Sequence, residues 1–309
     1  MRPKLFGRIV LALLAIAFFG VYLYLHITVA PYSEDLGAPG ELYEPWTAKD
    51  HEARPLPIAV PGARTPEPAP TPEPTSEPTP EPTPEPTLDP NSPEARAQAL
   101  GLPKPPEVDV NSWELMLVNA DHSIGEYAPE QMGYLNQVAD DLEVRLTYDG
   151  NRCPVDARIG EPLIAFARGC RDAGLPVFLS SGYRSYYEQY QNFQRVCANN
   201  GVTDGKDGSG HYITMPAGCS EHQAALCCDI TDRYYPIKNS SLENTETFHW
   251  LLEHCAEYGF IHRFPEGKED ITGVMYEPFH FRYVGVEAAT YMMENNLCLE
   301  EFLALYGVE

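Results

Sequence analysis

The spacing of hydrophobic positions changes along the chain, and the longest apolar run comes first. Positions 9–25 carry almost only apolar side chains, and the run continues with lower purity to Ala30. Arg2, Lys4 and Arg8 precede it. A run close to bilayer length behind a basic flank is typical of a membrane helix whose basic end stays in the cytoplasm. We therefore expect residues 1–30 to be an uncleaved anchor, with a cleaved signal peptide as the alternative.

Hydrophobic periodicity is absent from residues 31–106, which we expect to form a disordered extracytoplasmic tether. Within it, residues 65–90 hold eleven of the thirty prolines in a near-repeat of Pro-Glu-Pro-Thr. Proline at this density disfavours helix and sheet and favours polyproline II, which extends by roughly 3.1 Å per residue. This segment is therefore expected to be a stiffened spacer, and a ligand for a proline-binding domain is the alternative.

Helical and strand-like spacings return in residues 107–309, which we expect to form a single domain. WELMLVN (113–119) and the apolar run 175–179 indicate strands. Helical spacing through 161–173 predicts a helix that ends at Gly174. Ser185 and Glu188 form a capping-box pattern and predict a helix to about Ala198, so Arg184 lies at a strand-to-helix junction.

The second half of this domain continues the mixture of helices and strands. Residues 199–218 are rich in Gly, Asp, Asn and Ser and predict a long loop. Helical spacing resumes over 245–258, a final strand is expected over 279–284, and 287–306 is expected to be helical. The stretch CSEHQAALCCD (219–229) indicates a turn followed by a buried strand.

Charge and cysteine content limit the possible classes of function. The formal net charge is −24, and no cluster of Lys or Arg occurs beyond the anchor flank. This argues against nucleic acid as a partner, since phosphate binding needs clustered cations. The eight cysteines permit up to four disulfides in an exported chain, and the absence of a CxxC pair argues against a structural zinc knuckle.

Several cysteine pairings are conceivable, and the sequence does not choose among them. A Cys197–Cys219 bridge would close the long loop. Alternation along a strand places Cys227 on the same face as Asp229 and Cys228 on the other, so Cys228 is expected to pack toward a helix, with Cys255 as a candidate bridge partner. Cys227 as a fourth metal ligand would close the position that a catalytic water needs.

Two pairs of residues carry candidate chemistry. His222 and Asp229 form one pair, and Glu277 and His280 in EPFHFRYVG form the other. Two imidazoles and a carboxylate can hold a catalytic zinc, and a further carboxylate can act as base on its water. Spacing alone is weak evidence in so acidic a chain. The position of Asp229 at the end of an apolar run strengthens it, because an unpaired buried carboxylate is costly.

Three ordered motifs closely resemble the zinc D,D-carboxypeptidases of the VanY type, a family that includes LdcB-like L,D-carboxypeptidases. They are SGYRS (181–185), SEHQAALCCDI (220–230) and GFIHRFPEGKEDITGVMYEPFHFRYVG (259–285). The resemblance covers roughly residues 110–290. It implies an α+β domain with a central antiparallel sheet flanked by helices, the D,D-peptidase/hedgehog-like zinc peptidase fold.

The same resemblance implies roles for individual residues. It places zinc ligands at His222, Asp229 and His280 and the general base at Glu277. It assigns Arg184 to the substrate carboxylate or the developing oxyanion. Ser220 and Gln189 match positions that line the substrate pocket. Ala225 stands where relatives often have glycine, and EPFH replaces the more usual EPWH.

The expected function is that of an enzyme of the bacterial cell membrane. It would remove the terminal D-alanine of peptidoglycan stem peptides or their precursors, and its catalytic domain would lie outside the membrane. L,D-cleavage of tetrapeptide stems and an endopeptidase that cuts cross-links are alternatives within this class. A non-catalytic peptidoglycan-sensing module and a purely structural domain are alternatives outside it. Glu277 argues against the sensor, which has no need of a base.

Overall fold

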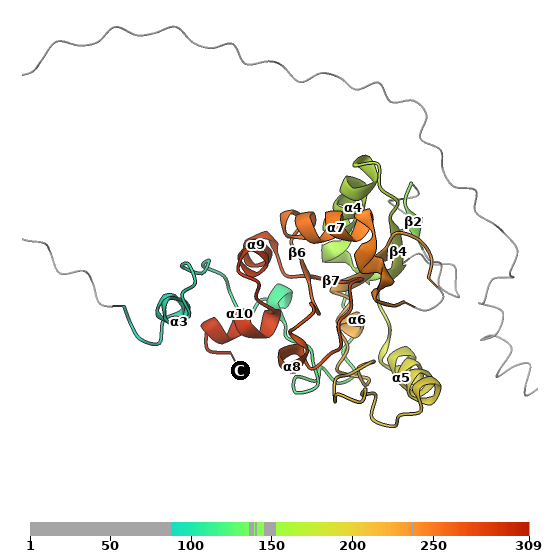
Figure 1. Ribbon diagram of the computed structural model, residues 1–309, viewed down its shortest axis with the longest axis horizontal. Coiled ribbons are helices and arrows are strands. Elements are labelled where there is room, and N and C mark those ends of the chain that lie inside the picture. Colours follow the sequence, from blue (N-terminus) through green and yellow to red (C-terminus); the bar gives the residue numbers. More distant parts are fainter. Residues whose placement is uncertain (1–87, 136–138, 140, 145–152, 236–237, 309) are drawn as a thin grey trace, which may run out of the picture. The chain divides into compact units, whose positions relative to one another are not determined.

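A five-stranded mixed sheet forms the centre of the described residues (Figure 1), and two of the candidate residues, Asp229 and His280, lie on its strands. The computed structural model describes residues 88–135, 139, 141–144, 153–235 and 238–308. The strands lie in the order β2 (Glu143–Val144), β4 (Phe178–Ser181), β5 (Cys227–Thr231), β7 (His280–Tyr283) and β6 (Phe260–His262). β2 runs parallel to β4, and the other pairs are antiparallel. The expectation of a central antiparallel sheet is confirmed for β4, β5, β7 and β6 and corrected for β2, because a helical crossover between β2 and β4 returns the chain in the same direction.

That crossover helix, α4 (Ala157–Asp172), confirms the helix expected over 161–173. It follows a small antiparallel pair, β1 (Met132–Gly133) and β3 (Val155–Asp156). After β4, helix α5 (Tyr186–Asn200) begins with the expected capping box, in which Ser185 and Glu188 bond each other's backbone N–H. It ends at Gly201, whose φ of 68° favours glycine.

The two faces of the sheet have different chemistry. Cys228 and Ile230 of β5 belong to the main hydrophobic core, together with Phe166 of α4. Figure 1 shows α4 and α7 (Glu246–His254) together over one side of the sheet. Cys227 and Asp229 point to the other face by strand alternation, as expected. The side of the sheet away from the main core therefore carries the polar residues.

The segment expected to be a strand over 113–119 is instead a 3₁₀ turn, η1 (Trp113–Leu115), followed by irregular chain. Its backbone carbonyls bond to a side chain rather than to a neighbouring strand: Arg282 Nη2 donates to Glu114 O and Met116 O, each at 2.9 Å. Trp113 stacks on Tyr283 with ring centroids 5.8 Å apart. The apolar pattern thus reflects packing of a loop onto β7.

The C-terminal part is helical, as expected, but it forms two helices where one was expected. Two helices, α9 (Val286–Glu294) and α10 (Leu299–Leu305), replace the single helix expected over 287–306. They are separated at Asn296, whose φ is 52°. Helix α3 (Pro93–Ala99) packs against α10. The remaining short elements are η3 (Ser240–Asn244), η4 (Cys255–Tyr258), which continues α7, and α8 (Glu269–Thr272).

The expected disulfides are not formed. All eight cysteines are free and buried. The loop between Cys197 and Cys219 is closed by backbone pairing instead, since Tyr212 bridges both Lys206 and Val274. Cys228 packs toward the helical side as expected, but its neighbour is Cys153, with 3.5 Å between the sulfur atoms.

The anchor expected over residues 1–30 and the tether with its spacer at 65–90 lie outside the described residues. Among the described residues, none of the helices has the length and apolar character needed to cross a bilayer. From residue 88 onward they belong to one compact unit, Glu85–Glu309.

Candidate metal centre

The first candidate ligand, His222, lies on a single helical turn rather than on a strand. Helix α6 (Glu221–Ala224) precedes β5, and Ala225 ends it with a φ of 59°. Glycine adopts this left-handed conformation without strain, whereas it costs a non-glycine residue roughly 1–2 kcal/mol. The tight reversal brings His222 back over the strand that carries Asp229.

Ala225 offers a direct test of this turn. Ala225→Val is expected to lower the free energy of unfolding by about 2 kcal/mol or more, because a branched side chain is strained at positive φ and Ala225 is fully buried. Ala225→Gly is the matched control and is expected to stay within about 1 kcal/mol of the parent, since relief of strain offsets the lost methyl group. Urea unfolding measures both. Equal losses in the two variants would contradict the argument.

His222, Asp229 and His280 converge on one another. Asp229 and His280 are directly paired across β5 and β7. Asp229 Oδ1 lies 3.4 Å from His222 Nε2 and 3.1 Å from His280 Nδ1. The two imidazole rings are perpendicular, with centroids 5.0 Å apart. One carboxylate oxygen and two ring nitrogens therefore face a common point, and all three residues are buried.

The outer nitrogen of each imidazole is fixed by a hydrogen bond. His222 Nδ1 donates to Gly182 O at 2.7 Å, which leaves the Nε2 lone pair directed at the site. His280 Nε2 lies 3.1 Å from Glu221 Oε2, which leaves Nδ1 for the site. Partners of this kind orient histidines that bind metals and raise their basicity. The two histidines predicted as ligands thus have the outer hydrogen bonds that are typical of metal-binding histidines.

Glu221 is held in turn by buried arginines. Arg263 Nε donates to Glu221 Oε1 at 2.7 Å, and Arg282 Nη1 donates to the same oxygen at 2.8 Å. Arg263 also pairs with Glu300 of α10 at 2.6 Å. Burial alone would raise the pKa of Glu221, but the two arginines outweigh it and hold that pKa far below its usual value. Glu221 is therefore an anion that supports His280.

Glu277 lies beside the ligands without joining them. Its Oε2 is 3.7 Å from His280 Nδ1. Burial raises the pKa of this carboxyl group, which favours proton exchange with a bound water over permanent ionisation. The backbone carbonyl of Glu277 lies 3.0 Å from His262 Nε2, and this contact fixes the turn before β7.

Arg184 lies between β4 and α5, as the sequence suggests. Its Nη1 donates to Gln189 Oε1 at 2.6 Å, and Gln189 Nε2 donates to Met215 O at 2.5 Å. Its buried Nε has no hydrogen-bond partner in the described part of the chain. Burial lowers the pKa of Arg184, and the charges of Asp229 and Glu277 act against this, so the guanidinium lies within electrostatic reach of the ligands.

Gln189 and Ser220 occupy supporting positions. Gln189 is buried and orients Arg184 rather than offering a free amide to solvent. Ser220 precedes α6 and is also buried. Their assignment to the substrate pocket remains a prediction.

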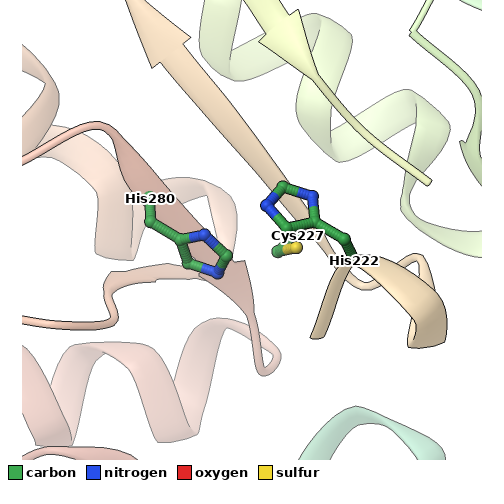
Figure 2. Close-up of side chains that lie close together, drawn as sticks. All are labelled: His222, Cys227 and His280. Carbon is green, nitrogen blue, oxygen red and sulfur yellow. The ribbon is translucent and has the colours of Figure 1, made fainter. Parts of the chain in front are cut away.

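Lys238 was not foreseen from the sequence, whereas Cys227 was expected on the face of the strand that carries Asp229. Lys238 Nζ forms a salt bridge with Asp229 Oδ2, the oxygen that faces away from the histidines. The Cys227 thiol lies between the two imidazoles: the ligand atoms of His222, Cys227 and His280 are all within 4.8 Å of one another (Figure 2). Burial raises the pKa of the Cys227 thiol, but the two histidines outweigh it and lower that pKa to about 7.

The electrostatics of the three predicted ligands match a cation site. Burial disfavours the charge on Asp229, yet Lys238 and His222 hold its pKa well below the usual value. Burial likewise opposes protonation of His280, and contacts with Cys227, Asp229 and Glu221 nevertheless raise its pKa well above 6.5. A bound divalent cation would take the place of these ring protons, since metal binding releases protons from its ligands. Nitrogen and carboxylate donors suit zinc.

The fold and the donor set therefore fit the metal centre of a hydrolase, with the carboxylate of Glu277 beside it. Residues 153–286 match the VanY family model, described as D-alanyl-D-alanine carboxypeptidase. A D-alanyl-D-alanine carboxypeptidase of Enterococcus faecalis is 35% identical over 201 residues, which cover 63% of this chain and 67% of that protein. The chain belongs to the VanY-type D-alanyl-D-alanine carboxypeptidase family, as its motifs indicate.

Solved structures with the same fold include two peptidases. The LdcB L,D-carboxypeptidase is 29% identical with a TM-score of 0.53, and the match covers 64% of this chain and 92% of that one. The D,D-dipeptidase VanXYg, solved with a D-Ala-D-Ala phosphinate analogue, is 25% identical with a TM-score of 0.50. That match covers 62% of this chain and 70% of VanXYg.

Proposed function

We propose that this chain is a zinc-dependent D,D-carboxypeptidase that removes the terminal D-alanine from peptidoglycan stem peptides. The observation that carries the proposal is the convergence of His222 Nε2, Asp229 Oδ1 and His280 Nδ1, at 3.4 and 3.1 Å, with Glu277 at 3.7 Å from the last of these. Membership of the family supplies the substrate class.

The chemistry divides among a few residues. His222, Asp229 and His280 would hold the zinc, which when bound supplies Lewis-acid activation of water at neutral pH. Glu277 accepts the proton of the attacking water and returns it to the leaving amine. Because partial burial raises the pKa of the Glu277 carboxyl group, it can hold that proton between the two steps.

Arg184 binds the carboxylate at the end of the peptide. Its planar guanidinium can donate two parallel hydrogen bonds, and its Nε, which bonds to none of the described residues, can be one of the two donors. The Gln189 bond fixes the other edge of the group. A free terminal carboxylate is what distinguishes a carboxypeptidase substrate from an internal peptide bond, so Arg184 gives the site its preference for chain ends.

L,D-cleavage is the second candidate, and the structural similarity to LdcB over 92% of that chain favours it. Pentapeptide and tetrapeptide stems separate the two activities. The purified zinc-loaded protein is expected to shorten the pentapeptide by one alanine and to leave the tetrapeptide intact, as measured by mass spectrometry of the products. Loss of alanine from the tetrapeptide alone would reverse the assignment. Hydrolysis that persists after chelation of the metal would reject the zinc mechanism.

The proposal includes an extracytoplasmic location. It is supported by the basic flank, the apolar run to Ala30 and the proline-rich spacer at 65–90. A tether of this kind would let a membrane-bound domain reach stem peptides in the wall or in its precursors.

A further inference from the structure

Cys227 is a buried thiol that the proposed mechanism does not use. It begins β5, has no exposed surface, and lies on the same face of the strand as Asp229. Figure 2 shows its sulfur beside the ring of His222, with His280 opposite.

The two histidines are oriented so that each turns one ring nitrogen toward the site beside Cys227. Gly182 and Glu221 hold the outer ring nitrogens, so the inner nitrogens are the ones available to a metal. One ring nitrogen of each histidine and the sulfur of Cys227 form one group of potential ligand atoms within 4.8 Å of one another. Sulfur and imidazole nitrogen are both preferred zinc donors.

The adjacent cysteine provides the contrast. Cys228 faces the apolar core, where its sulfur lies 3.5 Å from that of Cys153. Burial raises the pKa of Cys228 well above its usual value. Of these two adjacent cysteines, Cys228 therefore lies in the apolar core, and only Cys227 lies beside the histidines.

We propose that Cys227 is a fourth protein ligand of the metal held by His222, Asp229 and His280, and that its thiolate closes the coordination shell in the resting enzyme. The inference rests on the proposed function and adds that Cys227 controls access of the catalytic water to the same site. Four protein ligands are typical of closed structural zinc centres, whereas catalytic centres keep a position for water. Water must therefore displace the sulfur before hydrolysis begins. Cys227 releases its thiol proton to solvent on ligation and regains one from solvent on displacement.

The test uses X-ray absorption at the zinc edge on the zinc-loaded protein. The parent and Cys228→Ser, the matched control, are expected to show a sulfur neighbour at about 2.3 Å, and Cys227→Ser is expected to lose it. Cobalt substitution gives a second readout, because a thiolate ligand adds a near-ultraviolet charge-transfer band that the same variant should lack. Cys227→Ala serves as a second substitution where serine perturbs folding.

The second measurement is the rate of peptide hydrolysis. Hydrolysis of the pentapeptide per bound zinc is expected to rise in Cys227→Ser, because water no longer competes with sulfur. A parent protein that binds zinc and hydrolyses the peptide without a sulfur neighbour overturns this inference and leaves the proposed function intact. A sulfur neighbour without hydrolysis in either protein overturns the proposed function instead. A sulfur neighbour with an unchanged rate in the variant overturns the closed resting state.

Discussion

Glu277→Gln is expected to abolish hydrolysis of stem peptides while zinc stays bound. The substitution keeps the size of the side chain and removes the group that accepts the proton of water. Loss of a general base typically costs about 10²–10⁴-fold in rate. Because Glu277 lies 3.7 Å from His280 Nδ1 and is not one of the three predicted ligands, zinc content should remain near one per chain.

The measurement pairs turnover of the pentapeptide with metal analysis of the same sample. Glu266→Gln is the control, since it neutralises an exposed carboxylate in the same segment. An active Glu277→Gln protein would refute the assigned base. A variant that has lost its zinc would show instead that Glu277 contributes to metal binding.

Glu221→Ala is expected to damage both stability and metal binding. The substitution leaves Arg263 and Arg282, both 0% exposed, without their shared carboxylate. Removal of one partner of a buried ion pair costs about 3–5 kcal/mol, because an uncompensated charge remains inside. It also releases His280 Nε2, and loss of such an outer partner weakens metal affinity by about 10–100-fold.

Denaturant unfolding of the metal-free protein measures the first effect, and a competition titration with a chelating dye measures the second. Asp141→Asn is a suitable control. Asp141 also binds two arginines, Arg168 and Arg171, but at the surface, where solvent screens the pairs. It should leave the free energy of unfolding nearly unchanged. If Glu221→Ala were equally mild, the buried cluster would not support the site.

The three predicted zinc ligands lie in short sequence motifs, and the structure brings these residues together, while their role as ligands stays a prediction. His222 and Asp229 are seven positions apart, and the turn at Ala225 brings them together locally. His280 joins them through the pairing of β5 with β7, which the sequence does not state. The resemblance of the two motifs to one family supplied that link.

Other features depend on contacts between distant segments. Glu221 stands next to His222, yet its role follows from Arg263 and Arg282, which come 42 and 61 positions later. The backbone carbonyls of Glu114 and Met116 accept hydrogen bonds from Arg282. The segment therefore forms a 3₁₀ turn, although its apolar pattern is typical of a strand. The cysteine neighbours likewise could not be deduced, because Cys153 and Cys228 meet only after α4 has crossed over the sheet.

The alternation along β5 also protects the protein against misfolding. A slip of one residue between β5 and β7 would turn Asp229 into the apolar core beside Phe166 and turn Ile230 toward the polar face. An ionised carboxylate in that core would be far too costly to tolerate, so the slipped pairing is excluded during folding. The residues that make the site reactive thus also enforce the register that builds it.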